Sequence, residues 1–207
     1  MKRLLGSVLL LVAATGCSGA PADPEPRPAD DLASLLRTRA TAGGPGSCGP
    51  EQVAVTLEGY DVALGHRYTR ITVRNLSDRP CRLEGAPGIG ARGANGSTFE
   101  PAVEQANTPA ATPVELAPGA AAGSALEWTG ELAGADSEHA SLLVLQLAAD
   151  QPPVSVPARL VGDTEETDPL DIGPLTTLRL APFTALTAEE ASRTPRSRDE
   201  PVRPEKP

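Results

Sequence analysis

Apolar side chains recur at every second position over most of residues 53–180, which is the spacing of a β-strand with one buried face. Residues 69–74 illustrate the pattern, because Ile71 and Val73 share one face and two arginines share the other. Residues 142–147 are almost continuously apolar, which is typical of a central strand. We expect the remaining strands where the alternation returns, at residues 53–57, 81–84, 98–104, 124–128, 154–160 and 176–182.

Turn-forming residues separate these segments. Residues 75–80 and 116–119 are rich in turn formers, and residues 85–96 hold five glycines and are expected to be a loop. Pro157, inside the expected strand at 154–160, indicates that this strand lies at an edge. Because no helix of about ten residues separates the strands, an α/β architecture is excluded. We predict an all-β fold, an antiparallel β-sandwich of about seven to eight strands.

The N-terminus has the layout of an export signal. Lys2 and Arg3 precede an apolar run at residues 4–14, which at about 1.5 Å per residue is too short to span about 30 Å of hydrocarbon. Small residues then lead to Cys17, an order that resembles a bacterial lipobox, in which the cysteine sulfur is acylated and becomes the new N-terminus.

We therefore expect a lipoprotein signal peptide over residues 1–16 and acyl chains such as palmitate on Cys17. Two or three acyl chains hold a protein stably at a membrane, whereas one holds it only marginally. The alternatives are ordinary secretion, with cleavage near Ala20 or Ala22, and an uncleaved anchor. The expected location is the extracytoplasmic face of the cell membrane.

The chain has three cysteines, an odd number that an exported protein must account for. If Cys17 carries lipid, Cys48 and Cys81 remain as an even pair in an oxidising compartment, and we expect them to form a disulfide. The alternatives for this pair are two free thiols or, less favourably, a metal site.

The chain divides into four regions by composition. After the signal, residues 17–47 are rich in proline and acidic residues and form an expected stalk, with a short amphipathic helix over residues 30–39 as an option. Residues 48–185 hold the strands and form the domain. Residues 186–207 are polar, of mixed charge, and are expected to be a disordered tail.

Composition excludes some partners. The net charge is −9, no basic stripe offsets it, and aromatic residues are 2% of the chain, so nucleic-acid binding is not expected. No apolar run long enough for a transmembrane helix follows the N-terminal segment. We expect a monomer whose membrane contact is the lipid.

Residues with catalytic or metal-binding chemistry are sparse. His66 and His139 are expected in solvated turns. Ser141 is close to His139 in the sequence, but closeness in sequence does not make a catalytic triad, so no catalytic residue is assigned. The acidic run at residues 162–171 offers calcium ligands, of which the candidates are Asp163, Glu165 and Asp168, with Glu166 and Asp171 beside them. A solvated acidic loop is the preferred interpretation. No metal and no cofactor is expected.

Residues 71–89, Ile-Thr-Val-Arg-Asn-Leu-Ser-Asp-Arg-Pro-Cys-Arg-Leu-Glu-Gly-Ala-Pro-Gly-Ile, resemble the actinobacterial family called domain of unknown function 4232. Three further pieces agree in order and spacing: Cys-Gly-Pro at 48–50, Leu-Ala-Pro-Gly to Leu-Glu-Trp at 116–128, and Leu-Arg-Leu-Ala-Pro-Phe at 178–183. The resemblance implies an immunoglobulin-like sandwich on exported proteins, often behind a lipobox. It implies no established activity and no functional residues.

These observations favour a non-enzymatic, lipid-anchored module that binds an envelope protein, a polymer or a small ligand, or that has a structural role in the envelope. Loops 85–97 and 162–174 are the expected adaptable surface. The alternatives are a solute-binding lipoprotein that works with a transporter and, less favourably, a hydrolase. A deep polar pocket would favour the first of these, and a Ser or Asp near a histidine in a cleft would favour the second.

Overall fold

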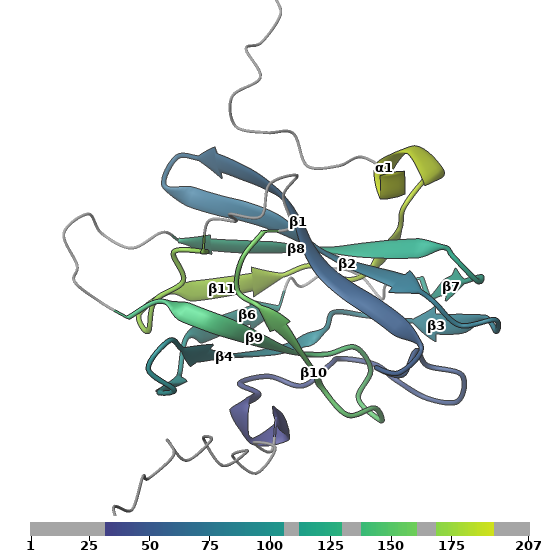
Figure 1. The fold of residues 1–207 in the computed structure, drawn as a ribbon, viewed down its shortest axis with the longest axis horizontal. Helices are drawn as coiled ribbons and strands as arrows, with labels where there is room; N and C mark the ends of the chain where they lie inside the picture. Colours follow the sequence, from purple (N-terminus) through teal and green to yellow (C-terminus); the bar gives the residue numbers. More distant parts are fainter. Residues whose placement is uncertain (1–31, 106–111, 130–137, 161–168, 193–207) are drawn as a thin grey trace, which may run out of the picture. The chain divides into compact units, whose positions relative to one another are not determined.

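The computed structural model describes residues 32–105, 112–129, 138–160 and 169–192, and the regular secondary structure of these residues is almost entirely β-strand (Figure 1). The expected signal peptide at residues 1–16, Cys17 and the acidic residues at 163, 165, 166 and 168 lie outside them. The strands of the described chain are β1 (Val53–Ala63), β2 (His66–Asn75), β3 (Cys81–Leu83), β4 (Gly88–Gly93), β5 (Thr98–Phe99), β6 (Ala102–Gln105), β7 (Val114–Leu116), β8 (Ala121–Thr129), β9 (Ala140–Gln146), β10 (Val154–Pro157), β11 (Thr177–Leu180) and β12 (Thr184–Ala185).

The larger sheet has six strands in the order β1-β2-β8-β11-β6, and β12 also pairs with β8. All its pairs are antiparallel except β11 with β6, which is parallel. β11 and β12 lie along the same edge of β8, so residues 181–183 between them form a bulge in what is otherwise one strand.

The second sheet has four strands in the order β10-β9-β4-β5, and β3 pairs with β7 in a separate two-stranded sheet. The structure confirms that residues 142–147 form an inner strand, β9, and that the strand after the two prolines, β10, lies at an edge. The expected strand at 98–104 is divided, because β5 pairs with β4 whereas β6 pairs with β11 of the other sheet.

One hydrophobic core joins the two larger sheets. Its fully buried side chains include Ile71 of β2 and Trp128 of β8 from the six-stranded sheet, together with Ile89 of β4 and Leu143 of β9 from the four-stranded sheet. The alternation of apolar residues that predicted the strands thus corresponds to side chains that point, at every second position, into this core.

Cys48 and Cys81 form a disulfide, as the cysteine count predicted. Cys48 precedes β1 and Cys81 begins β3, and both are buried in the hydrophobic core. Because the two residues are 33 positions apart, the bond restricts a substantial loop of the unfolded chain.

The segment at residues 32–47 differs from the expected free stalk, because it packs on the domain. A short 3-10 helix, η1 (Leu32–Leu35), takes the place of the longer helix considered over residues 30–39, and Leu35 is buried. The backbone N–H groups of Arg37 and Thr38 both donate to the carbonyl of Ile89 in β4, at 2.8 and 3.2 Å. The domain therefore begins earlier in the chain than residue 48.

Residues 85–97 also differ from prediction, because their centre is not a loop. Residues 88–93 form the inner strand β4, and most of it is buried. The glycines are explained by close backbone approach: a Cβ at Gly90 would lie 1.9 Å from the carbonyl oxygen of Leu35, and one at Gly88 would lie 2.6 Å from that of Thr38. This strand is therefore not available as an adaptable binding loop.

The start of the expected tail is also part of the fold. Residues 188–192 form a short helix, α1 (Ala188–Ser192), which begins at a capping box: the Thr187 hydroxyl accepts from the Glu190 amide, and the Glu190 carboxylate accepts from the Thr187 amide. At the other end of α1, Arg74 donates to the Ala191 carbonyl at 2.7 Å. None of the helices in the described ranges is long and apolar enough to cross a membrane.

Removal of the disulfide should lower the free energy of unfolding by about 3–4 kcal/mol, the chain-entropy value for a loop of this length. The variant Cys48→Ala/Cys81→Ala should show this loss in urea denaturation. Unfolding of the wild-type protein in a reducing agent breaks the cross-link but keeps both sulfur atoms. This measurement therefore separates the effect of the cross-link from the effect of sulfur packing in the core. An unchanged unfolding midpoint in reduced wild type would show that the cross-link is dispensable.

Gly90→Ala should displace the segment at 32–41, because the new methyl group collides with the backbone of Leu35. We expect a loss of about 1–3 kcal/mol in stability and faster tryptic cleavage after Arg37 and Arg39 in the folded protein. Gly46→Ala is the matched control, because no atom lies within 4 Å of its Cβ position and only its φ of +83° opposes the change. Cleavage at the wild-type rate in Gly90→Ala would contradict the close approach.

Candidate functional site

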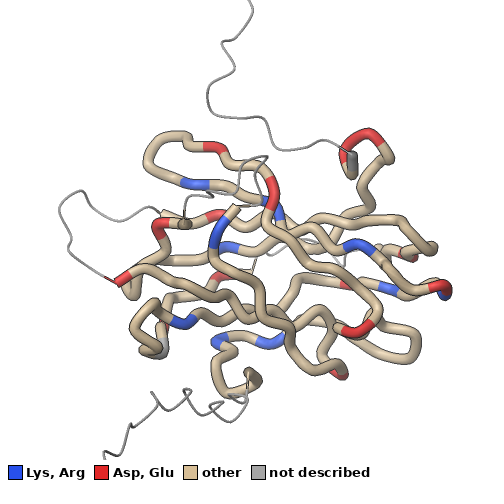
Figure 2. The backbone as a smooth tube through the Cα atoms, viewed as in Figure 1, with Lys and Arg blue, Asp and Glu red and all other residues tan. Residues whose placement is uncertain are grey.

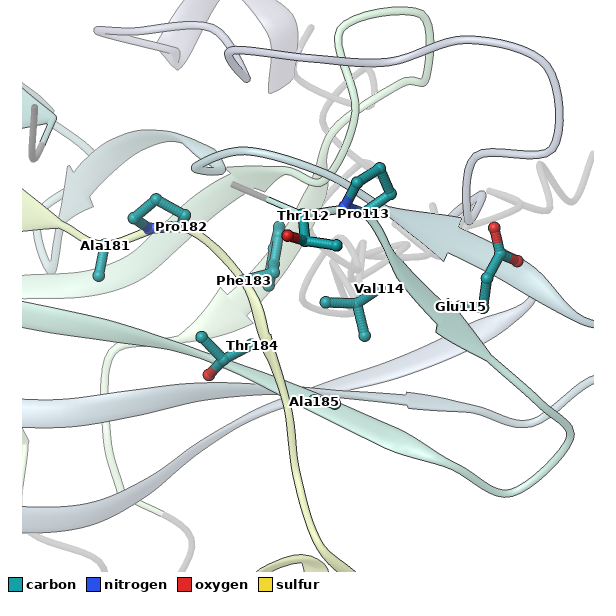
Figure 3. A pocket seen from close by; sticks show the side chains of 9 residues that line it. All are labelled: Thr112, Pro113, Val114, Glu115, Ala181, Pro182, Phe183, Thr184 and Ala185. Carbon is teal, nitrogen blue, oxygen red and sulfur yellow. The ribbon is translucent and has the colours of Figure 1, made fainter. Parts of the chain in front are cut away.

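A groove lined by described residues lies between β7 and the β11–β12 bulge, and we call it the edge groove (Figure 3). Its volume is about 650 Å³. One wall comes from the start of β7, the other from the bulge and β12, and most of the lining is apolar; the lining residues are Thr112, Pro113, Val114, Glu115, Ala181, Pro182, Phe183, Thr184 and Ala185.

The bulge that forms one wall is held by specific hydrogen bonds. The Ser124 hydroxyl donates to the Ala181 carbonyl at 2.6 Å, and the Phe183 amide donates to the Gly85 carbonyl at 2.9 Å. Pro182 between them has no N–H to pair with a neighbouring strand. The Phe183 ring is turned into the core, where it is 2% exposed, so it backs the groove but offers almost no surface to it.

Both walls of the edge groove are strand edges with unused backbone groups. The Leu186 amide donates to the Ala121 carbonyl, so in this antiparallel pair the N–H and C=O of the preceding residue, Ala185, point away from β8. Arg82 of β3 exchanges its backbone bonds with residues 46 and 48, so its partner Glu115 also directs its backbone groups away from β3. β7 and β12 are not paired with each other in the described residues.

A row of charged side chains crosses the solvent face of the six-stranded sheet. Arg179 of β11 donates to Glu104 of β6 at 2.7 Å and to Glu127 of β8 at 3.1 Å. The hydrogen bond to Glu104, followed by the one to Glu127, raises the pKa of the Arg179 guanidinium. Both carboxylates are paired with the same guanidinium, so the row stabilises the β8-β11-β6 pairing and leaves no free charge on Arg179.

His66 begins β2 at the end of this row and is not in a solvated turn. Its Nδ1 lies 2.7 Å from Oε1 of Glu127. This Nδ1 has no hydrogen-bond partner among the described residues, and its contact with Glu127 is ionic only when the imidazole is protonated. The ring also stacks on Tyr68, with centroids 6.4 Å apart.

Asp171, the last member of the predicted acidic run, has a structural role. Its carboxylate accepts from the Arg67 guanidinium at 3.0 Å and from the indole N–H of Trp128 at 2.9 Å. The Tyr60 ring lies 6.1 Å from the Trp128 ring. These contacts satisfy the one polar atom of a fully buried tryptophan, and they commit both Asp171 oxygens to protein donors.

The other predicted site residues are not brought together with these. Ser141 lies in β9, and its hydroxyl donates to the carbonyls of Arg92 and Gly93. His139 precedes β9 and is exposed. The calcium candidates Asp163, Glu165 and Asp168 lie outside the described residues, and within the described ranges no group of three potential metal ligands is found.

Sequence reasoning missed the edge groove, although part of it was in view. Ala181 and Pro182 fall inside the expected strand at 176–182 as well as in the family motif at 178–183, and a proline inside a strand pattern is the signal of a bulge. The opposite wall, residues 112–115, was not predicted as a strand, because Val114 and Leu116 are too short a run for the alternation to be visible.

The fold and the groove define a class of protein: an all-β domain of several sheets, closed by one disulfide. Residues 48–176 match the model of the family described as Domain of unknown function (DUF4232), which is more than half of the chain, and the protein belongs to this family. No curated protein and no solved structure matches the chain.

Replacement of Asp171 should destabilise the domain through Trp128. Asp171→Ala leaves the indole N–H and the Arg67 guanidinium without their acceptor, and we expect a loss of about 2–4 kcal/mol in the free energy of unfolding. Asp171→Asn keeps an acceptor for the indole and should lose about half as much. Because Trp128 is the only tryptophan, its fluorescence reports the change directly.

Asp150→Ala is the control for this comparison, because Asp150 also accepts a hydrogen bond, from the Gly44 amide, but at an exposed position. It should cost less than about 1 kcal/mol. Equal losses in Asp171→Ala and Asp150→Ala would show that the buried acceptor has no special role.

Proposed function

We propose that this protein is an exported, lipid-anchored β-sandwich of the immunoglobulin-like type that acts as a non-enzymatic binding or envelope-structural module. The single observation that carries the proposal is the disulfide between Cys48 and Cys81. It leaves Cys17 as the third cysteine, directly after an apolar run and small residues. Structural disulfides form in oxidising compartments, which supports export.

The immunoglobulin-like type of sandwich is supported by two sheets that share one core and by the predominance of antiparallel pairs. The parallel β6–β11 pair adds an edge strand to the larger sheet. An experimental structure that placed the two larger sheets side by side, and not face to face, would overturn this part of the proposal.

A binding or structural role is supported by how the chemically reactive side chains are used. Ser141 donates to backbone carbonyls, Asp171 accepts from Trp128 and Arg67, and His66 stacks on Tyr68. The edge groove is apolar, whereas the solute-handling alternative called for a deep polar pocket.

The lipid anchor is tested by Cys17→Ala in the full chain, expressed in a bacterial host that modifies lipoproteins. Wild type should partition into the detergent phase of an extract, and its intact mass should exceed that of residues 17–207 by the mass of the acyl groups. Cys17→Ala should lose both properties. Ser18→Ala, which changes the next residue and keeps the sulfur, should retain them.

A wild-type protein found in the aqueous phase, with Cys17 removed, would identify ordinary secretion and overturn the anchor. A wild-type protein that keeps residues 1–16 would identify an uncleaved segment and overturn it equally.

A further inference from the structure

We propose that Asn95, in the turn that joins β4 to β5, is a site of self-modification, where the backbone of the next residue, Gly96, converts the side-chain amide to a carboxylate (Figure 1). The inference goes beyond the proposed function and does not depend on it, because the reaction needs only water and the folded chain. It rests on the exposure of the turn, the residue that follows Asn95, the contacts of Asn95, and the contrast with Asn75.

The turn is a short hairpin loop, residues 94–96, at the surface of the protein. The Gly93 amide donates to the Ser97 carbonyl at 2.8 Å, and the Gly96 amide donates to the Gly93 carbonyl at 3.0 Å. Asn95 and Gly96 are both exposed. Gly96 has a φ of +83°, which glycine adopts without strain. Asn-Gly therefore suits the turn, but it also places an amide carbon next to a peptide nitrogen that no neighbouring side chain shields.

These two atoms can react with each other. The Gly96 nitrogen loses its proton to solvent base and attacks Cγ of Asn95. The new N–Cγ bond closes a five-membered imide, and the side-chain nitrogen takes up a proton and leaves as ammonia. One water molecule then adds to either carbonyl of the imide and opens the ring. The product is aspartate when the original main chain is restored, and isoaspartate when the chain continues through the former side chain.

The side chain of Asn95 is not held away from this reaction. Within the described residues its amide group has no hydrogen-bond partner, and the residue is anchored by its backbone N–H, which donates to the Glu138 carboxylate. The bond from the Gly96 amide to the Gly93 carbonyl must open before the nitrogen can attack. Because the turn is exposed, this local opening costs much less free energy than global unfolding.

Asn75 has the same side chain in the opposite surroundings. It is fully buried, and its side-chain nitrogen donates to the carbonyls of Arg79 and Leu116 at 2.7 and 2.9 Å. The peptide nitrogen that would attack it belongs to Leu76 and donates to the Gln52 carbonyl at 2.8 Å. The leucine side chain also shields that nitrogen. The same reaction at Asn75 therefore has to wait until the domain unfolds.

The modification would change the contacts that hold the turn. Glu138 accepts from the Asn95 amide through one carboxylate oxygen and from the Ser97 hydroxyl through the other. A new carboxylate at position 95 arises beside this existing negative charge, and the two repel each other. Isoaspartate also adds one atom to the backbone of the loop, so the Gly93–Ser97 pair that closes it cannot keep its geometry.

β5 is the element that this change would loosen. It pairs with β4 through Thr98 and Phe99, and the Phe99 side chain is buried in the core. β6 follows β5 closely and pairs with β11 of the other large sheet, so the chain crosses between the sheets here. The site would thus act as a timer, because the hold of β5 on the fold weakens with the age of the molecule.

The reaction is tested by peptide mapping with mass spectrometry on the full chain, kept folded in neutral buffer. Asn95 should gain the mass of an amide-to-acid conversion more than about a hundredfold faster than Asn75, which reacts only on global unfolding. It should also react within about tenfold of its rate in the urea-unfolded chain. The rate should rise with pH, since the attacking nitrogen must first lose a proton, and Asn95→Gln should remain unmodified, because a six-membered ring closes less readily.

Equal rates at the two asparagines, or a folded-state rate at Asn95 more than about tenfold below that of the unfolded chain, would overturn the proposal. A protease that cuts before aspartate should leave part of the product uncut, which identifies isoaspartate. Complete cleavage would indicate direct hydrolysis of the amide by water and would overturn the attack by Gly96.

The structural consequence is tested on the aged fraction, which its extra charge separates by anion exchange. Hydrogen exchange of the Gly93 amide should be about tenfold faster there than in the unmodified fraction of the same sample. Asn95→Asp should speed this exchange more weakly, and the effect should disappear in a Glu138→Gln background, where no charge repels the new one. Unchanged exchange of Gly93 in the aged fraction would overturn the timer. A chain that proves to be unlipidated leaves all these results unaffected.

Discussion

Burial of alternate side chains from β2 and β8 against the four-stranded sheet is the interaction on which the rest of the structure depends. β8 pairs with β2 along one edge and with β11 and β12 along the other, so its Leu126 and Trp128 lie at the centre of the core. Every other constraint acts on this packing. The disulfide links the segment before β1 to β3. Asp171 accepts the hydrogen bond of the Trp128 indole N–H, so the ring can be buried without an unpaired polar atom.

The four-stranded sheet depends on a different constraint, which is the lack of side chains in β4. Gly88 and Gly90 allow the backbone of residues 35–40 to lie directly on this strand and to bond with Ile89 (Figure 1). Residues 35–40, which are too few to form a hydrophobic core of their own, thereby cover one part of the four-stranded sheet. Figure 2 shows the charged residues spread over the strands and loops without a single dominant patch, which agrees with the mutual pairing of Arg179, Glu104 and Glu127.

The edge groove arises where two regular patterns fail. Residues 181–183 interrupt the strand formed by β11 and β12, and β7 pairs on one side only, with β3. A bulge and an unpaired edge are local departures from the ladder, and such places collect exposed apolar side chains and unused backbone groups. This is why the best candidate for binding lies there, and why the charged row on the open sheet face, whose members bind one another, is the weaker candidate.

Period-two alternation identified β1, β2, β8 and β11, and a continuous apolar run identified β9, because these signals are local. The number of cysteines favoured the pair Cys48–Cys81 once Cys17 was set aside for lipid, and the structure shows that disulfide. The tertiary structure alone decided that a glycine-rich stretch is the inner strand β4, that residues 32–47 cover it, and that Thr112–Glu115 meets Ala181–Ala185 in a groove. Glycine has no side chain whose period could reveal a strand, and its role became evident only from the backbone that packs against it. Contacts between segments about 70 residues apart depend on which edges the sheets leave open, and that is a property of the whole fold.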